Sequence, residues 1–169
     1  MKSAEPAPVF PLAPNRTVRR PKPLALSPAR QILVLGYAKV TPDTLSLTLP
    51  VPPSINHQYA TVNGRRVLSA SGRSYKAIVG QQVLLGLTRA PHRQALLHTL
   101  RANDLSLSIR FYFASPLRRD VDGGLKIAQD ALCEALDLND NRVAEIHLYK
   151  TRDVRHPRIE ITLGSAISS

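Results

Sequence analysis

Cysteine, tryptophan and long hydrophobic runs are scarce in this chain of 169 residues. It has one cysteine, Cys133, no tryptophan, and an aromatic content of only 5%. A single cysteine excludes an internal disulfide and is typical of proteins from a reducing compartment. No apolar run is long enough to cross a bilayer, and the N-terminus lacks the unbroken apolar core of a signal peptide. We therefore expect a cytoplasmic protein with no membrane partner and a core of Leu, Val, Ile and Ala.

Acidic residues are also few. The chain has 12 Asp and Glu against 23 Lys and Arg, which gives a net charge of +11. Such an excess attracts polyanions, either nucleic acid or an acidic membrane surface. Seven of the 12 acids fall between Asp120 and Glu145, so one acidic segment lies within a basic protein. This distribution suits a nucleic-acid enzyme that uses a divalent metal. The alternative is an acidic helix that only balances its surroundings.

Proline divides the chain into two parts. Residues 1–30 hold seven of the 14 prolines, and proline removes backbone donors and blocks helices. We therefore expect this part to be a basic N-terminal arm that is disordered or extended. The arm either adds phosphate contacts or is a non-essential leader. Residues 31–169 are predicted to form a single domain.

Hydrophobic periodicity predicts both strands and helices in that domain. We expect strands over 31–40, 43–50, 104–114, 143–150 and 158–163, where apolar residues alternate with polar ones or form short runs. Asn63-Gly64 predicts a tight hairpin turn. Helices are expected over 71–88, capped by Ser71 or Ser74, and over 123–136. Because strands and helices do not alternate strictly, we expect an α+β fold in which helices pack on one face of a mixed β-sheet.

The stretch 115–126, SPLRRDVDGGLK, links the clearest strand to the second helix. If the chain is still extended there, Asp120 and Asp122 point to the same side. Two carboxylates held together repel each other unless a cation lies between them, and hard oxygen ligands suit Mg²⁺ or Mn²⁺. Lys126 follows Asp122 by four residues, where its ammonium would stabilise charge developing on a bound phosphate.

A metal site of this kind needs a further carboxylate. Asp140 is the first candidate because it directly precedes a predicted strand, and Asp137 and Glu145 are the alternatives. An Asp-x-Asp pattern also occurs in surface ion pairs, and Asp122 alone suits a helix N-cap. The five histidines show no ligand spacing, so a zinc site is disfavoured.

The motifs of this region resemble those of a known family. RRDVDGGLKIAQDAL followed by LNDNRV resembles the RusA-like Holliday junction resolvases, whose motif runs Arg-Asp-x-Asp-Asn-x-x-Lys, Asp-Ala-Leu and Asp-Asp-x-Gln-Val. Upstream, PPSIN matches the family's Pro-Pro-Ser-x-Asn segment. The motifs occur in the same order and span roughly residues 45–163. Two positions depart from the pattern: Gly123 stands at the family's Asn, and Asn139 stands at the first acid of its acidic pair.

The resemblance implies a specific activity. It predicts a RusA-like fold and a homodimeric, Mg²⁺-dependent or Mn²⁺-dependent endodeoxyribonuclease that resolves four-way junctions by paired symmetric nicks in DNA recombination and repair. It assigns the metal to Asp120, Asp122 and Asp140, with Lys126 as a further catalytic residue. The Gly123 departure implies that a hydrogen bond behind the metal ligands is missing.

Basic residues outside the acidic segment are candidates for DNA contact. We expect branched DNA to be bound through Arg118, Arg119, Arg65, Arg66, Arg73 and Lys76. The alternatives are ion pairs of Arg118 and Arg119 with nearby acids, and a solvated face for the remaining four. Two other functions stay open. One is a non-catalytic junction-binding or DNA-binding protein that retains the fold, and the other is a Mg²⁺-dependent nucleotide phosphohydrolase.

Overall fold

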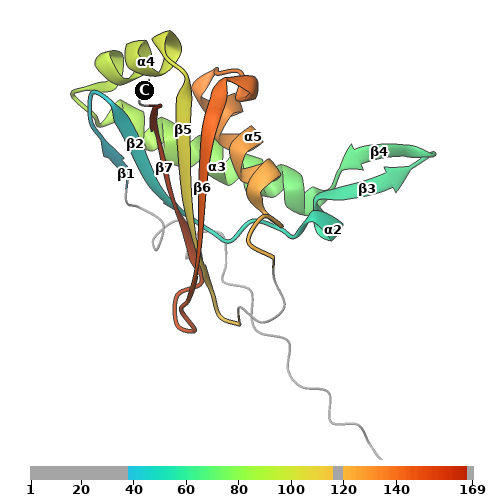
Figure 1. Ribbon diagram of the computed structural model, residues 1–169. Coiled ribbons are helices and arrows are strands. Elements are labelled where there is room, and N and C mark those ends of the chain that lie inside the picture. Colours follow the sequence, from blue (N-terminus) through green and yellow to red (C-terminus); the bar gives the residue numbers. More distant parts are fainter. Residues whose placement is uncertain (1–37, 116–119, 167–169) are drawn as a thin grey trace, which may run out of the picture.

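The computed structural model describes residues 38–115 and 120–166, which form a five-stranded mixed sheet with helices on one face (Figure 1). The strand order is β1-β2-β7-β5-β6, in which only the β5–β6 pair is parallel. The strands span Ala38–Val40 (β1), Thr44–Leu49 (β2), Leu105–Phe113 (β5), Val143–Arg152 (β6) and Arg158–Ser165 (β7). The predicted α+β fold, with helices packed on one face of a mixed sheet, is confirmed.

Alternation of apolar and polar residues determines which face of the sheet is buried. In β2, β5 and β7, every second residue is buried, and each intervening residue except Gly164 is at least partly exposed. Three helices cover the apolar face: α3 (Ala70–Thr88), α4 (Arg93–Ala102) and α5 (Leu125–Leu136). The opposite face carries polar pairs such as Ser46 and Thr162, whose hydroxyl oxygens lie 3.0 Å apart. The strands therefore have one face in the core and one polar face, as their sequences predict.

The helix boundaries differ from the prediction in three places. The N-cap of α3 is Ser69, whose hydroxyl accepts a hydrogen bond from the Gly72 amide at 3.0 Å, so the caps predicted at Ser71 and Ser74 are wrong. The helix begins earlier because the preceding strand already ends at Leu68. Helix α5 begins at Leu125 rather than at 123, because both glycines belong to the turn that precedes it. Helix α4 was not predicted at all.

A β-hairpin projects from the body of the molecule on the far side from α4 (Figure 1). It consists of β3 (Tyr59–Val62) and β4 (Arg65–Leu68) and follows the short helix α2 (Ile55–Gln58). Asn63 and Gly64 have φ angles of 50° and 73°, as the two-residue hairpin turn requires, so the predicted turn is confirmed. All residues from Ala60 to Val67 are exposed, so the hairpin is solvated along most of its length.

Some predictions fall outside the described residues. These are the N-terminal arm 1–30, the part of the first strand that precedes Ala38, and the arginines at 118 and 119. Within residues 38–115 and 120–166, no helix is both long and apolar enough to cross a membrane.

Burial protects the single cysteine. Cys133 is only 3% exposed, and this burial raises the pKa of its thiol to about 11. At pH 8 we therefore expect about 0.1% thiolate, against roughly a quarter for an ordinary thiol with a pKa near 8.5. Labelling with a disulfide reagent should be slow in native buffer and stoichiometric after unfolding in guanidinium. Complete labelling of the native protein within seconds would contradict this expectation.

Candidate active site

The proline-rich segment after β2 packs directly against the turn that precedes α5. A Cβ atom added to Gly124 would lie 2.3 Å from Cγ of Pro52 and 3.4 Å from the Phe111 ring. Only a residue without a side chain allows this contact, so Gly124 sets how closely the two segments approach. Between them lies a cleft of about 540 Å³, which is lined by Val51, Pro52, Pro53, Ser54, Ile55, Asn56, His57, Ser71, Phe111, Phe113, Asp120, Gly123 and Gly124.

A buried glutamine joins the same two segments by hydrogen bonds. Gln58 is only 2% exposed, and its side-chain amide donates to the carbonyl oxygens of Pro53 at 3.0 Å and Gly123 at 3.1 Å. A buried amide without partners would be strongly destabilising, so these two bonds fix the position of the turn relative to the proline segment. The pattern of apolar residues does not predict this role, because Gln58 lies in a segment without periodicity.

The contact between Gly124 and Pro52 gives a direct prediction. Replacing Gly124 with alanine should destabilise the protein by about 1–3 kcal/mol, because the added methyl group overlaps a rigid proline ring. For a domain of this size that corresponds to a fall in melting temperature of roughly 2–10 °C, measurable by calorimetry.

Gly123→Ala is the matched control for this substitution. The closest atom to a Cβ at Gly123 is the Asp120 carbonyl oxygen at 3.4 Å, an ordinary contact. The control should therefore melt close to the wild type. Equal melting temperatures for the two variants would mean that the Pro52 contact does not restrict this turn.

The two aspartates lie in a turn rather than on an extended strand. The Gly123 amide donates to the Asp120 carbonyl at 3.3 Å, and the Leu125 amide donates to the Asp122 carbonyl at 2.9 Å. The condition for placing both carboxylates on the same side, an extended chain, is therefore not met. The N-cap of α5 is Gly124, without a side-chain cap, so Asp122 does not cap the helix. Both aspartate side chains remain exposed beside the first turn of α5.

Lys126 joins the start of α5 to the third predicted carboxylate. Its ammonium lies 2.7 Å from Oδ2 of Asp140 and 2.7 Å from Oδ1 of Asp130. Hydrogen bonds to Asp130 and to Asp140 raise the pKa of Lys126, and the hydrogen bond from Lys126 lowers the pKa of Asp140. At neutral pH the lysine is therefore a cation and Asp140 a carboxylate. A positive charge is held between two carboxylates at this position.

Asp140 is held in place by its own short helix. It begins η2 (Asp140–Arg142), and the N-cap is Asn139, whose side-chain oxygen accepts from the Asn141 amide at 3.2 Å. Gln129 of α5 donates to the Asp140 carbonyl at 3.2 Å, and Arg142 donates to the carbonyl of Arg101 at 2.7 Å. Arg142 also donates to the Asn103 carbonyl. These contacts fix η2 against both α5 and the connection between α4 and β5.

Asn139, which departs from the family's acidic residue, therefore serves as the N-cap of η2. Asn and Asp cap helices about equally well, so the capping bond from its side chain is one that an acid at this position would also form. What the substitution removes is a negative charge beside Asp140, and not the support of η2.

The predicted site residues fall into two neighbouring regions. Asp120 lines the cleft beside Pro52, whereas Lys126, Asp130 and Asp140 line an adjacent hollow of about 600 Å³ between α3, α5 and η2. Among the described residues, no three His, Cys, Asp or Glu side chains are arranged so that they could hold a metal ion. The structure thus brings Lys126 to Asp140, but it does not gather all three predicted carboxylates.

The two alternatives to Asp140 lie elsewhere. Asp137 ends α5 in the left-handed conformation, and its side chain is 97% exposed with Arg101 3.9 Å away. Glu145 lies on β6, 3.5 Å from His147. Neither is bonded to Lys126, so Asp140 is the best placed of the three.

The basic residues predicted to contact DNA have different environments. Arg65 and Arg66 are exposed on the hairpin, and the Arg66 guanidinium lies 4.1 Å from the centre of the Tyr59 ring. Arg73 donates to the Leu68 carbonyl at 2.6 Å. Lys76 forms an ion pair of 2.5 Å with Glu134 of α5, so its charge is partly balanced. DNA contact at these four positions stays a prediction.

Known proteins resemble this chain over most of its length. The sequence profile of the family described as endodeoxyribonuclease RusA matches residues 50–164, from the proline segment through β7. The crossover junction endodeoxyribonuclease RusA of Escherichia coli strain K12 is 31% identical over 122 residues, which cover 72% of this chain and 94% of that protein. The same is true of the protein of that name from Shigella sonnei strain Ss046. The protein of that name from Enterobacteria phage 82 is 29% identical over the same coverage.

These matches cover both regions of the site, the proline cleft and the hollow at α5. The sequence is thus that of a class of DNA-cutting nucleases. The chain belongs to the RusA family of endodeoxyribonucleases.

Proposed function

We propose that this protein is a Mg²⁺-dependent endonuclease that resolves four-way DNA junctions by paired symmetric nicks. The observation that carries this proposal is the Lys126–Asp140 contact at the first turn of α5, next to the turn that holds Asp120 and Asp122. Membership of the RusA family supplies the reaction class, and relatives named crossover junction endodeoxyribonuclease point to the branched substrate.

The donor groups suit a hard divalent cation. Asp120, Asp122 and Asp140 offer carboxylate oxygens, the ligands that Mg²⁺ and Mn²⁺ prefer, and the first two carboxylates are exposed. Asp140 already binds a cation, the Lys126 ammonium. The described structure does not gather these three carboxylates, so we propose that they converge on the metal when it binds. When bound, the metal would activate water and stabilise charge on the phosphate.

The residues of this chain would then act in defined ways. Lys126 would stabilise the negative charge that develops on the scissile phosphate, from a position that Asp130 and Asp140 fix by hydrogen bonds. The start of α5 has no side-chain cap, and amides at a helix N-terminus favour a nearby anion. The absence of a side chain at Gly123 would let a DNA backbone approach the turn closely.

Symmetric nicks require two active sites. A homodimer with two-fold symmetry would present two copies of the aspartate turn to a junction that has its own two-fold symmetry. We propose this assembly, and equilibrium ultracentrifugation with and without junction DNA tests it.

The second candidate function is a non-catalytic junction-binding protein. It is favoured by the separation of Asp120 from the hollow that holds Asp140, and by the departures at Gly123 and Asn139. Against it, Asn139 retains the capping role that an acid would have. A Cβ atom at Gly123 would make only an ordinary contact with the Asp120 carbonyl oxygen, so the turn does not depend on a glycine there.

A cleavage assay on a synthetic four-way junction, with Mg²⁺ titrated from zero, separates these functions. A resolvase should produce paired nicks that depend on the metal. A pure binding protein should retard the junction on a gel without nicking it. Hydrolysis of free nucleotides together with inactivity on junctions would instead indicate a nucleotide phosphohydrolase.

A further inference from the structure

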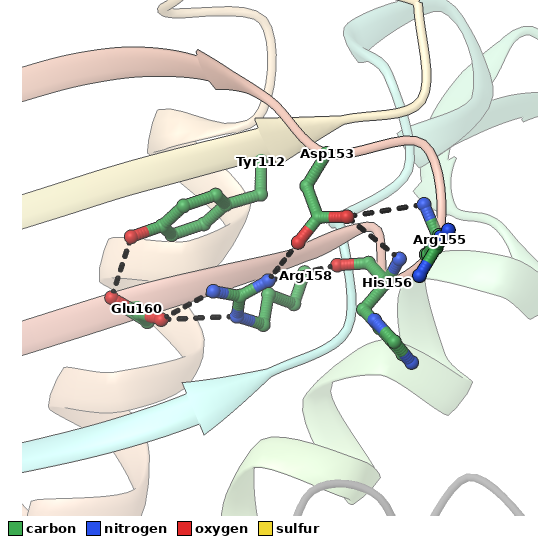
Figure 2. A network of polar contacts seen from close by, with 6 residues as sticks. All are labelled: Tyr112, Asp153, Arg155, His156, Arg158 and Glu160. Carbon is green, nitrogen blue, oxygen red and sulfur yellow. Dashed lines mark hydrogen bonds and ion pairs between the residues drawn. The ribbon is translucent and has the colours of Figure 1, made fainter.

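The loop between β6 and β7 is held rigid by a dense set of polar contacts (Figure 2). At its centre, the Arg158 guanidinium donates to Oε1 of Glu160 from Nε at 3.0 Å and from Nη2 at 2.8 Å. Its Nη1 donates to Oδ2 of Asp153 at 2.7 Å. The guanidinium also lies 3.8 Å from the centre of the Tyr112 ring, whose hydroxyl donates to Oε2 of Glu160 at 2.9 Å. Arg158 therefore joins the loop to both β5 and β7.

Asp153 determines the backbone path of the loop. Its Oδ1 accepts hydrogen bonds from the amides of Arg155 at 3.1 Å and His156 at 3.0 Å. The amide of Asp153 itself donates to the Phe113 carbonyl at 2.9 Å, at the end of β5. We call residues 152–157 the basic tip. Its shape is fixed by Asp153 and Arg158 rather than by burial, since most of its side chains are exposed.

The basic tip contains two exposed arginines that form no ion pair within the described residues. Arg152 and Arg155 are exposed, and neither forms a side-chain ion pair among residues 38–115 and 120–166, whereas both nearby acids, Asp153 and Glu160, are bonded to Arg158. Val154 lies between them and is 59% exposed. Two unpaired arginines on a rigid loop are well suited to bind the phosphate backbone of a nucleic acid.

The position of the basic tip relates it to the candidate active site. Parallel strands β5 and β6 end at the same edge of the sheet, where Phe113 of β5 is paired with Arg152 of β6. Phe113, whose carbonyl binds the Asp153 amide, lines the same cleft as Asp120. A duplex arm that reaches the aspartate turn would therefore pass close to the tip.

We propose that the basic tip is a DNA-backbone site in which Arg152 and Arg155 grip one arm of the branched substrate beside the scissile phosphate. This inference rests on the proposed function. Its occupant is DNA rather than a second copy of the chain, because a two-fold contact through the tip would bring the arginines of one copy close to those of the other. The net charge of +11 also favours a polyanion.

The test is junction binding by the double variant Arg152→Ala/Arg155→Ala. Fluorescence anisotropy over a series of NaCl concentrations, in chelator to prevent cleavage, gives the affinity and its salt dependence. We expect the affinity to fall about tenfold, and the slope of log K against log [salt] to become shallower by about 2, since each phosphate contact contributes about 0.9.

Arg89→Ala/Arg93→Ala is the matched control. Both residues are exposed at the connection between α3 and α4, at the opposite end of the sheet, and their removal lowers the net charge by the same amount. The control should keep its affinity within about twofold. Equal losses in the two double variants, or no loss at the tip, would overturn the proposal.

Two further measurements separate the remaining explanations. If the tip variant loses binding only because an oligomer dissociates, as light scattering would show, the tip is a contact between copies and the proposal is wrong. Wild-type cleavage with Mg²⁺ is measured in parallel. If the wild type neither binds nor cuts junctions, the proposed function fails. If it cuts them and the tip variant binds as tightly as the wild type, only the tip proposal fails.

Discussion

Replacing Asp122 or Asp140 with asparagine is expected to abolish junction cleavage while leaving junction binding in place. Asparagine keeps the size of the side chain but removes the charge that would hold Mg²⁺. A bound metal ion lowers the activation free energy of such a step by several kcal/mol. A change of about 4 kcal/mol corresponds to roughly a thousandfold in rate. We therefore expect single-turnover cleavage to slow by about a thousandfold or more.

The control for this experiment is Asp43→Asn. Asp43 is exposed in the turn between β1 and β2, away from the cleft, and its backbone amide already donates to Thr41. It should cleave and bind like the wild type. Asp120→Asn should behave like Asp122→Asn, because both aspartates lie in the same turn. Full cleavage by the Asp122 and Asp140 variants would exclude the assigned metal ligands.

Replacing Lys126 with methionine is expected to lower kcat by about a hundredfold to a thousandfold, the range found for the loss of one group that stabilises transition-state charge. Methionine keeps most of the length of the side chain but removes the ammonium that lies 2.7 Å from both Asp130 and Asp140. The lysine would act on charge that develops during the reaction, so KM for the junction should change much less than kcat.

Two comparisons make the Lys126 experiment specific. Lys39→Met removes the same charge from β1, at the far edge of the sheet, and should leave kcat unchanged. Asp130→Asn keeps Lys126 but removes one of its two anchors, so it should lower kcat by less than Lys126→Met does. A Lys126→Met variant with normal kcat and raised KM would mean that the lysine only binds substrate.

Much of the fold could be predicted from the sequence because its strands alternate so regularly. Leu105, Leu107, Ile109 and Phe111 are all buried by 99% or more, as the period of two in β5 requires. The Asn63-Gly64 turn was predicted from the two positive φ angles that its residue types allow. Hydrophobic periodicity also predicted the helix over 71–88, and Tyr75, Val79 and Val83 are buried at helical spacing in α3.

Helix α4 could not be predicted in the same way. Of its 10 residues only Leu96 and Leu100 are buried, and this pair alone is too sparse a pattern to mark a helix. The start of α5 was also misplaced, since two successive glycines give no capping side chain from which to fix the boundary.

The site was predicted in its residue types rather than in its geometry. Charge and spacing singled out Asp120, Asp122 and Lys126, but the turn geometry at residues 120–124 depends on packing against Pro52 and on the hydrogen bond from Gln58. Those contacts join residues about 65 positions apart, which no local pattern reveals. The contact between Lys126 and Asp130 follows helical spacing, whereas the contact with Asp140 depends on how η2 returns to α5.

The basic tip was missed for a related reason. The sequence does not distinguish Arg152, Arg155 and Arg158. In the structure, only Arg158 of these three forms ion pairs, with Asp153 and Glu160. Which arginines are available to a ligand depends on the positions of Asp153 in the β6–β7 loop and Glu160 in β7, and the sequence alone does not determine these.

The most direct test of the central claim is cleavage of one synthetic four-way junction by the wild type and by Asp122→Asn, with Mg²⁺ titrated in both. The account predicts paired, symmetric nicks that appear with the metal in the wild type, while the variant binds the junction without nicking it. Equal cleavage by both proteins, or junction binding by the wild type without nicks at any Mg²⁺ concentration, would contradict it.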